Sequence, residues 1–166
     1  MKVLGLDPGS RASGFGLVEY TAGAFRSFEF GVWRESSPRL SARLESLFRR
    51  CEEFLEKSRP AAASIETIFS GKSASSVFAL AQTRGVLLLA CARAQIPIFE
   101  YEPLTVKKTI TGYGRAEKPQ TREMVRSLLS AGQVQIPLDA ADALAMAICH
   151  CHHASAPNFD HPAAAC

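Results

Sequence analysis

Three strand-like segments stand in a row at the start of the chain, and they constrain the fold more than any other feature of the sequence. They cover residues 2–7, 14–20 and 25–33, and glycine-bearing turns join them. The first segment is apolar, and the third alternates apolar with polar residues. Both patterns are typical of strands. Because short turns connect neighbouring antiparallel strands, the sequence predicts an antiparallel meander here.

The remainder of the chain alternates between helical and strand patterns. Apolar residues recur at helical spacing from a cap at Ser36-Ser37-Pro38 to Pro60. A strand over 61–66, a helix over about 73–94 and a strand over 97–101 follow, and this order implies a parallel crossover. Further helices are expected to begin at Pro103, Pro119 and Asp139. We therefore predict an α/β fold, with a mixed five-stranded sheet whose first three strands are antiparallel and with helices on both faces.

Size and composition indicate an ordinary globular protein. A chain of 166 residues with 47% hydrophobic and 21% charged residues fits one domain and excludes the disordered, collagen-like and disulfide-scaffold classes. We expect that domain to cover 1–153, followed by a flexible tail over 154–166. The five cysteines suit reduced thiols in a cytoplasmic protein, and neither a signal peptide nor a membrane span is expected.

Four carboxylates are candidates for chemistry. Asp7 and Glu66 each end an apolar strand, and Asp139 and Asp142 are three residues apart on one alanine-rich helix. That spacing places both aspartates on the same helix face, and the small alanines allow close packing. A charged group beside a core must be paired or bound to metal. Four such groups suit Mg²⁺ or Mn²⁺, and two such ions can promote phosphodiester cleavage by water.

Each carboxylate also has a simpler interpretation. Asp139 and Asp142 could be a helix N-cap and a residue that favours the helix dipole. Asp7-Pro8-Gly9 could be only a turn, and Glu66 could be a solvated strand end. Spacing alone does not bring the four residues together.

Several motifs together resemble the RuvC family of Holliday junction resolvases, from residue 1 to about residue 153. The opening Gly5-Leu6-Asp7-Pro8-Gly9-Ser10-Arg11 is weakly specific, because actin-like ATPases and sugar kinases share its core. The segment Asp139-Ala140-Ala141-Asp142-Ala143-Leu144-Ala145 is more specific. The other matching segments are Ile65-Glu66 with Phe69, Gln82-Thr83-Arg84-Gly85, Phe99-Glu100-Tyr101, Val106-Lys107, Gly112 and Ala116-Glu117-Lys118.

This resemblance implies an RNase H-like fold and a homodimer that nicks two opposing strands of a four-way DNA junction symmetrically, in recombination and repair. It implies Mg²⁺ at Asp7, Glu66, Asp139 and Asp142, with two ions per subunit and Mn²⁺ as a substitute. Lys107 and Lys118 would support catalysis by offsetting charge near the scissile phosphate. A branch-migration helicase partner follows from the family alone.

Candidate DNA contacts lie in two regions. A basic cluster surrounds the loop Gly112-Tyr113-Gly114, and its alternative interpretation is a solvated helix end. The ring of Phe69, before the small segment that ends at Lys72, could stack on an unpaired base, or it could be part of the core. The basic cluster contains Lys107, Lys108, Arg115, Lys118, Arg122 and Arg126, and we expect DNA contacts at Phe69, Lys72, Lys108, Arg115 and Arg122.

Two helices carry further patterns. The helix over 73–94 is apolar on most sides, which predicts a partner subunit on its second face, unless helices of the same chain cover it. Cys149, His152 and His153 have a spacing that could bind Zn²⁺, although cations at the negative end of a helix explain the histidines more simply.

Rival functions remain at this point. Asp7-Pro8-Gly9-Ser10 with Gly14 resembles the phosphate-binding hairpin of actin-like ATP phosphotransferases, but their two lobes need about twice the length of a single domain. A junction-binding module without catalysis, or an RNase H-like relative that acts on RNA, would share many of the same features.

Overall fold

The sheet has five strands, as the sequence predicts. In this computed structural model, which describes residues 1–67 and 74–156, the strand order is β3-β2-β1-β4-β5. β1, β2 and β3 pair antiparallel, whereas β1 pairs with β4, and β4 with β5, in parallel. The strands are β1 (Lys2–Asp7), β2 (Ala12–Thr21), β3 (Ala24–Arg34), β4 (Ala62–Glu66) and β5 (Ile98–Tyr101).

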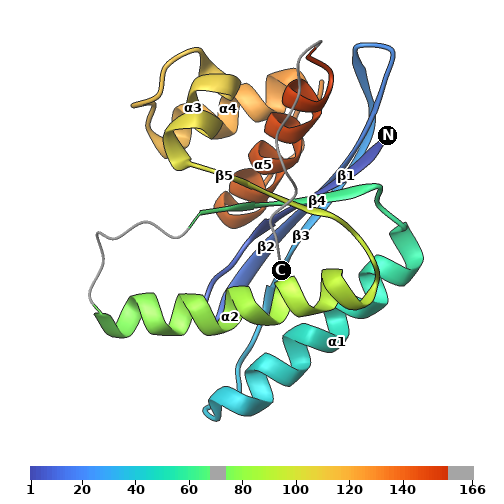
Figure 1. Cartoon of the computed structure of the whole chain (residues 1–166). Coiled ribbons are helices and arrows are strands. Elements are labelled where there is room, and N and C mark those ends of the chain that lie inside the picture. The colour runs from blue at the N-terminus through green and yellow to red at the C-terminus, as the bar shows by residue number, and fades with distance from the viewer. Residues whose placement is uncertain (68–73, 157–166) are drawn as a thin grey trace.

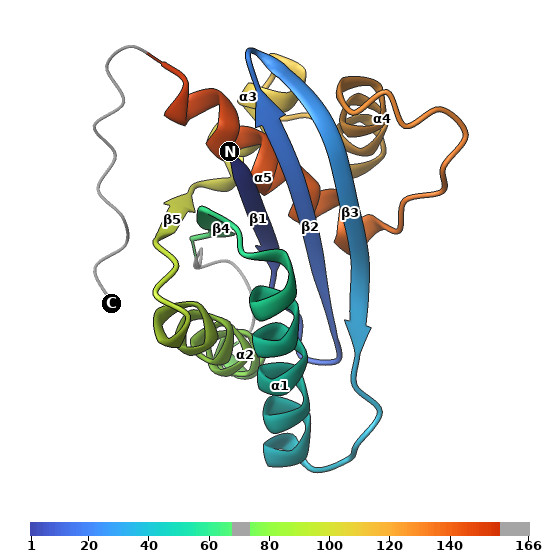
Figure 2. The same cartoon turned by 90° about the vertical axis from the view of Figure 1, so that its right-hand side faces the viewer.

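Five helices cover the two faces of this sheet. α1 and α2 lie on one face, and α3, α4 and α5 lie on the other (Figures 1 and 2). α2 is apolar, but neither it nor any other helix in the described part of the chain is long and apolar enough to cross a membrane. The helices are α1 (Leu40–Ser58), α2 (Ala74–Arg93), α3 (Pro103–Thr111), α4 (Lys118–Leu128) and α5 (Leu138–Ala154).

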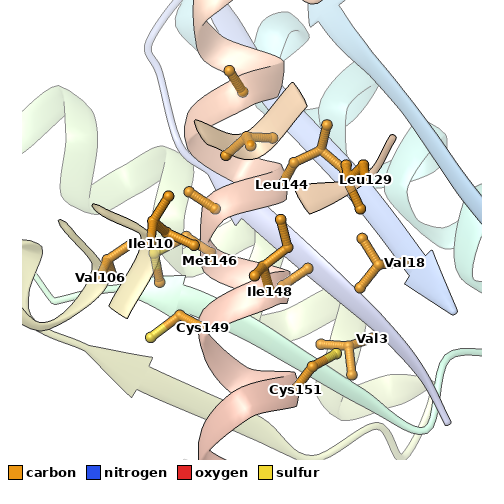
Figure 3. Close-up of a cluster of buried hydrophobic side chains, with 14 of the residues drawn as sticks. Val3, Val18, Val106, Ile110, Leu129, Leu144, Met146, Ile148, Cys149 and Cys151 are labelled. Atoms are coloured by element: carbon orange, nitrogen blue, oxygen red, sulfur yellow. The ribbon is translucent and has the colours of Figure 1, made fainter. Parts of the chain in front are cut away.

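Each face of the sheet has its own hydrophobic core. Successive residues of β1 contribute alternately to the two cores, because successive side chains of a strand point to opposite faces of the sheet. Val3 belongs to the cluster on the α5 side, where Figure 3 labels side chains of α3 and α5 around it, whereas Leu4 and Leu6 pack with α1 and α2. Asp7 is four residues after Val3, an even number, so its side chain points to the same face of the sheet, which α5 covers.

α5 packs unusually close to the sheet. A Cβ atom at Gly5 would lie 1.8 Å from the carbonyl oxygen of Ala143, and one at Gly14 would lie 2.0 Å from the carbonyl oxygen of Asp139. Real Cβ atoms do not come this close, so only glycine fits at either position. The alanines of α5 complete the contact, as the sequence predicts, and the start of α5 is thereby fixed beside the end of β1.

The predicted start of the first long helix was wrong by a few residues. α1 begins at Leu40, and its N-cap is Arg39, which makes no side-chain cap hydrogen bond. The guanidinium of Arg43 donates to the carbonyl oxygens of Ser10, Ser37 and Pro38. These bonds hold the segment before Arg39 in a turn, so the serines and Pro38 precede the helix.

Candidate active site

Asp7 and Glu66 lie side by side at one edge of the sheet. β1 and β4 are parallel, with Leu6 opposite Ile65. The next residue on each strand is Asp7 and Glu66, so the two carboxylates lie at the same level of neighbouring strands and on the same face of the sheet. The sequence predicted two strand-end carboxylates, and the parallel register accounts for their proximity.

The first turns of α5 bring two more carboxylates to this edge. α5 begins at Leu138, so Asp139 lies in its first turn and Asp142 follows one turn later. The N-cap is Pro137, and no side chain caps the helix. The interpretation of Asp139 as an N-cap is therefore wrong, although its position still suits the positive end of the helix dipole.

Electrostatic effects indicate that the other three carboxylates lie near Asp7. The pKa of Asp7 rises from its ordinary value of 3.8 to about 7. Loss of solvation by burial is the largest cause, and the negative charges of Asp142, Glu66 and Asp139 raise it further. Asp7 is therefore held in a partly dehydrated position among three other acids, where a bound cation would favour its ionised form.

Lys118 supplies a cation to this cluster. Its Nζ donates to Asp142 Oδ2 at 2.5 Å, and its charge lowers the pKa of Asp7. Burial would lower the pKa of Lys118, but the hydrogen bond and charge of Asp142, with Asp7 and Glu66, raise it overall. Lys118 is the first residue of α4, and a reciprocal capping box between Glu117 and Gln120 fixes the start of that helix.

A cavity of about 460 Å³ brings most of the predicted catalytic residues together. Asp7, Glu66 and Asp142 line it with the two lysines, and Asp139 lies nearby without lining it. Arg84 of α2 also lines it and was not among the predicted site residues. The sequence did carry a signal, since Arg84 is the only charged residue within the apolar helix before Arg93. The lining residues are Asp7, Pro8, Glu66, Thr67, Leu80, Arg84, Pro103, Val106, Lys107, Lys118, Thr121, Asp142, Ala145 and Met146.

The carboxylates do not form a preformed metal-coordination site in this structure. Within residues 1–67 and 74–156, no group of three or more His, Cys, Asp or Glu side chains is arranged to hold a metal ion. The Lys118 ammonium instead takes up part of the negative charge. Carboxylate oxygens are nevertheless the donors that hard divalent cations prefer, and Asp7 carries an unfavourable excess of neighbouring negative charge. The residues therefore fit divalent ions that would displace the ammonium from Asp142.

Three of the predicted DNA contacts, Lys108, Arg115 and Arg122, lie outside the cavity. Lys108 and Arg115 are exposed, and Arg122 is partly exposed and 3.9 Å from a carboxylate oxygen of Glu123. Arg126 bonds to Glu123 and to the carbonyl oxygen of Gly132, so this cation has partners within the chain. Phe69 and Lys72 lie outside the described residues.

The residues considered for zinc are engaged in packing. The Cys149 thiol is buried and donates to Thr109 Oγ1, which lies 3.4 Å from His153 Nε2. The ring of His152 packs against Tyr20 and Phe25. Cys149 and His153 thus share Thr109 while His152 packs on aromatic rings, and together the three form no metal site in the described part of the chain.

Comparisons with known proteins agree on one family. The family model for the crossover junction endodeoxyribonuclease RuvC matches residues 3–150. The chain is 42% identical over 153 residues to the protein of that name from Syntrophomonas wolfei, covering 92% of this chain and 89% of the relative. It is 44% identical over 154 residues to the one from Roseiflexus, covering 92% of each.

A solved structure of the same kind superimposes closely. Thermus thermophilus RuvC in complex with a Holliday junction substrate matches with a TM-score of 0.86 and 31% sequence identity, covering 93% of this chain and 94% of that one. The RNase H-like fold implied by the sequence resemblance is therefore confirmed.

Proposed function

This chain belongs to the RuvC family of crossover junction endodeoxyribonucleases, and we propose that it resolves four-way DNA junctions by nicking two opposing strands symmetrically. The single observation that carries the proposal is the cavity in which Asp7, Glu66 and Asp142 meet Lys107 and Lys118. Carboxylates in such a cavity can bind divalent ions, and the ammonium groups beside them can bind the phosphodiester that is cut. The reaction would serve homologous recombination and DNA repair.

We assign the metal ligands to Asp7, Glu66, Asp139 and Asp142 and expect two Mg²⁺ ions per subunit, which Mn²⁺ can replace. When bound, the ions supply Lewis-acid stabilisation of charge on the phosphate oxygens and favour attack by water. The fit rests on the donor set and on the raised pKa of Asp7, which ionises more readily once a cation is near.

Water is the nucleophile that suits this cavity. The hydroxyls that line it belong to Thr67 and Thr121. Thr121 donates to the carbonyl oxygen of Glu117, and Thr67 donates to that of Tyr101. Both hydroxyls are occupied by backbone acceptors and neither bonds to a side-chain base, so a covalent intermediate on the protein is not favoured.

Lys107 and Lys118 would hold and neutralise the scissile phosphate. Lys107 lies on α3, whose start is set by Pro103 and whose end is set by Gly112 in the left-handed conformation. Lys118 lies on the first turn of α4. Two cations from different helices can approach one phosphate from two directions, which offsets the charge that develops during hydrolysis.

The functional unit is a homodimer formed through α2. Phe78 and Leu89 are 70% and 54% exposed on this helix, although both are large and apolar. The exposed residues Ala81, Gln82, Gly85 and Ala92 lie on the same face at helical spacing. A second copy of the chain would bury this face around a two-fold axis and provide two cavities for two opposing strands.

DNA beyond the cavity would be held by the remaining basic residues and by one aromatic ring. Lys108, Arg115 and Arg122 are placed on or between α3 and α4, where they can contact phosphates. Phe69 and Lys72 would contact the region where the strands cross. A branch-migration helicase complex is a partner implied by the family alone.

The test compares three substrates incubated with the purified protein and Mg²⁺. The proposal expects paired, symmetric nicks in a synthetic mobile four-way junction and intact linear duplex and RNA–DNA hybrid. Tight junction binding without nicks would instead indicate a binding module, and cleavage of the hybrid would indicate an RNA-directed relative. ATP turnover without DNA would favour the phosphotransferase.

A further inference from the structure

Arg84 is a largely buried cation in the wall of the active-site cavity. Its side chain is 12% exposed, and it lines the cavity together with Asp7, Glu66 and Lys107. It lies at the flank of α2, between the buried residues and the exposed face that contains Gly85. An arginine in an apolar helix is costly to bury, so its position calls for a specific reason.

Glu100 anchors this arginine to the sheet. Arg84 Nη2 lies 2.7 Å from Glu100 Oε2. Glu100 is in β5, where it stands opposite Ile65 of β4, one residue before the pair of Glu66 and Tyr101. The guanidinium is therefore fixed relative to the strand that carries a proposed metal ligand. A partly buried ion pair contributes little to stability by itself, because desolvation offsets the attraction.

The three guanidinium nitrogens differ in access. Nε and Nη2 are shielded from solvent, and neither makes a hydrogen bond of good geometry in the described part of the chain, although Nη2 forms the ion pair with Glu100. Nη1 is not among the shielded nitrogens and has no protein acceptor there. Glu100 thus contacts one edge of the guanidinium, and Nη1 on the other edge is left for an acceptor in the cavity that Arg84 lines.

We propose that Arg84 binds a phosphate of the DNA strand in the cavity through Nη1, with Glu100 as the residue that orients it. The inference rests on the proposed junction cleavage and adds a third cation to Lys107 and Lys118. An arginine oriented by a carboxylate presents its remaining N–H groups in a fixed direction, which suits a phosphate oxygen better than a flexible ammonium.

Arg84→Gln removes the charge and keeps a polar side chain of similar length. Loss of one charge-assisted hydrogen bond should slow junction cleavage by about 10- to 100-fold. Arg84→Lys should retain part of the activity, and Glu100→Gln should lower it with Arg84 still present. Arg93→Gln is the matched control, because Arg93 lies on the same helix, 3.2 Å from Glu52, and outside the cavity. Thermal melts establish that each variant is folded.

Salt dependence separates a phosphate contact from a structural role. Junction binding is measured in EDTA, where no cutting occurs, at several salt concentrations. Loss of one phosphate contact should reduce the slope of log K against log salt by about 0.9 for Arg84→Gln, and Arg93→Gln should leave it unchanged. An unchanged slope for Arg84→Gln, with slower cleavage, would reduce Arg84 to a link between α2 and β5 and overturn the inference.

A chemically altered junction locates the contact. Methylphosphonates replace single phosphates near the cleavage site, one per junction, and wild type and Arg84→Gln are compared on each. The inference expects one position at which the two proteins bind equally, because the contacted charge is already absent. If the ratio of wild-type affinity to Arg84→Gln affinity is the same for every methylphosphonate position, the inference is refuted. If the wild-type protein cuts no junction at all, the proposed function itself fails, which these binding ratios distinguish from failure of the Arg84 contact.

Discussion

The ammonium of Lys118 lies 2.5 Å from Asp142 Oδ2, at the first residue of α4. A cation is unfavourable at this end of a helix, because the helix dipole is positive there. The acids of α5 and the sheet compensate for this, since Asp142, Asp7 and Glu66 all raise the pKa of Lys118. The position of Lys118 therefore favours its interaction with the acids of the site, although it slightly destabilises the start of α4.

Lys118→Ala should slow cleavage far more than it weakens junction binding. Removal of a positioned group that stabilises developing charge typically costs about 10²- to 10³-fold in rate. Single-turnover cleavage at saturating enzyme gives the rate, and a gel-shift titration in EDTA gives the affinity. Lys57→Ala is the matched control, because it removes the same charge from an exposed position on α1, outside the cavity. Equal losses in rate and affinity for Lys118→Ala would contradict the catalytic assignment.

The metal-free protein should lose stability as pH rises from about 4 to 7. The pKa of Asp7 in the folded state, about 7, is above its ordinary value of 3.8, so folding favours the protonated form. This contribution is complete below the ordinary value and disappears as pH rises through the folded one. The loss is on the order of 1–4 kcal/mol. Urea denaturation in EDTA at pH 5 and pH 8 measures it.

Asp7→Asn is the informative variant for this effect. Its neutral side chain should flatten the pH dependence of the unfolding free energy and make the metal-free protein more stable at pH 8. It should also abolish junction cleavage. Glu53→Gln, an exposed carboxylate on α1, should retain the wild-type dependence. If Asp7→Asn keeps both the wild-type pH dependence of the unfolding free energy and the cutting activity, the assignment of Asp7 to the site is wrong.

Leu89→Asp should convert the dimer to a monomer. Leu89 is 54% exposed on α2, and a carboxylate there would be desolvated without a partner in the proposed interface. Light scattering coupled to gel filtration measures the mass. The monomer should also lose paired nicking, since each cut would need a separate binding event. Val134→Asp, at an exposed apolar position outside α2, is the control. A monomeric wild type would refute the dimer.

Gly14→Ala should displace the start of α5 and damage stability and activity together. The new Cβ would lie 2.0 Å from the carbonyl oxygen of Asp139, and backbone cannot yield as a flexible side chain can. We expect a loss of about 1–3 kcal/mol in the free energy of unfolding, as for other overpacked contacts. Gly114→Ala, where the nearest atom is 3.5 Å away, should be nearly neutral. Chemical denaturation and cleavage rates test both.

The order of strands and helices could be predicted from the sequence because it depends on local periodicity. The start of α1 could not, since a distant contact decides it: Arg43 reaches the carbonyl oxygen of Ser10, 33 residues away. Among the site residues, Asp7 and Glu66 were found as carboxylates at strand ends. Their proximity depends on the register between β1 and β4, which no local pattern encodes.

The contacts of the cations were the hardest to predict. The bond from Lys118 to Asp142 joins residues 24 apart, and the ion pair from Arg84 joins α2 to β5. Both depend on how helices approach the sheet in three dimensions. The family resemblance supplied the role of Lys118, whereas for Arg84 it supplied only a matching segment, Gln82-Thr83-Arg84-Gly85, and no role.

The walls of the cavity come from residues between Asp7 and Met146, spread over β1, β4 and four of the helices. A nascent chain therefore lacks two of the proposed ligands until α5 has been synthesised and has docked against Gly5 and Gly14. Under the proposed function, a polypeptide that ends before α5 cannot complete this site, so cleavage depends on the last helix of the domain.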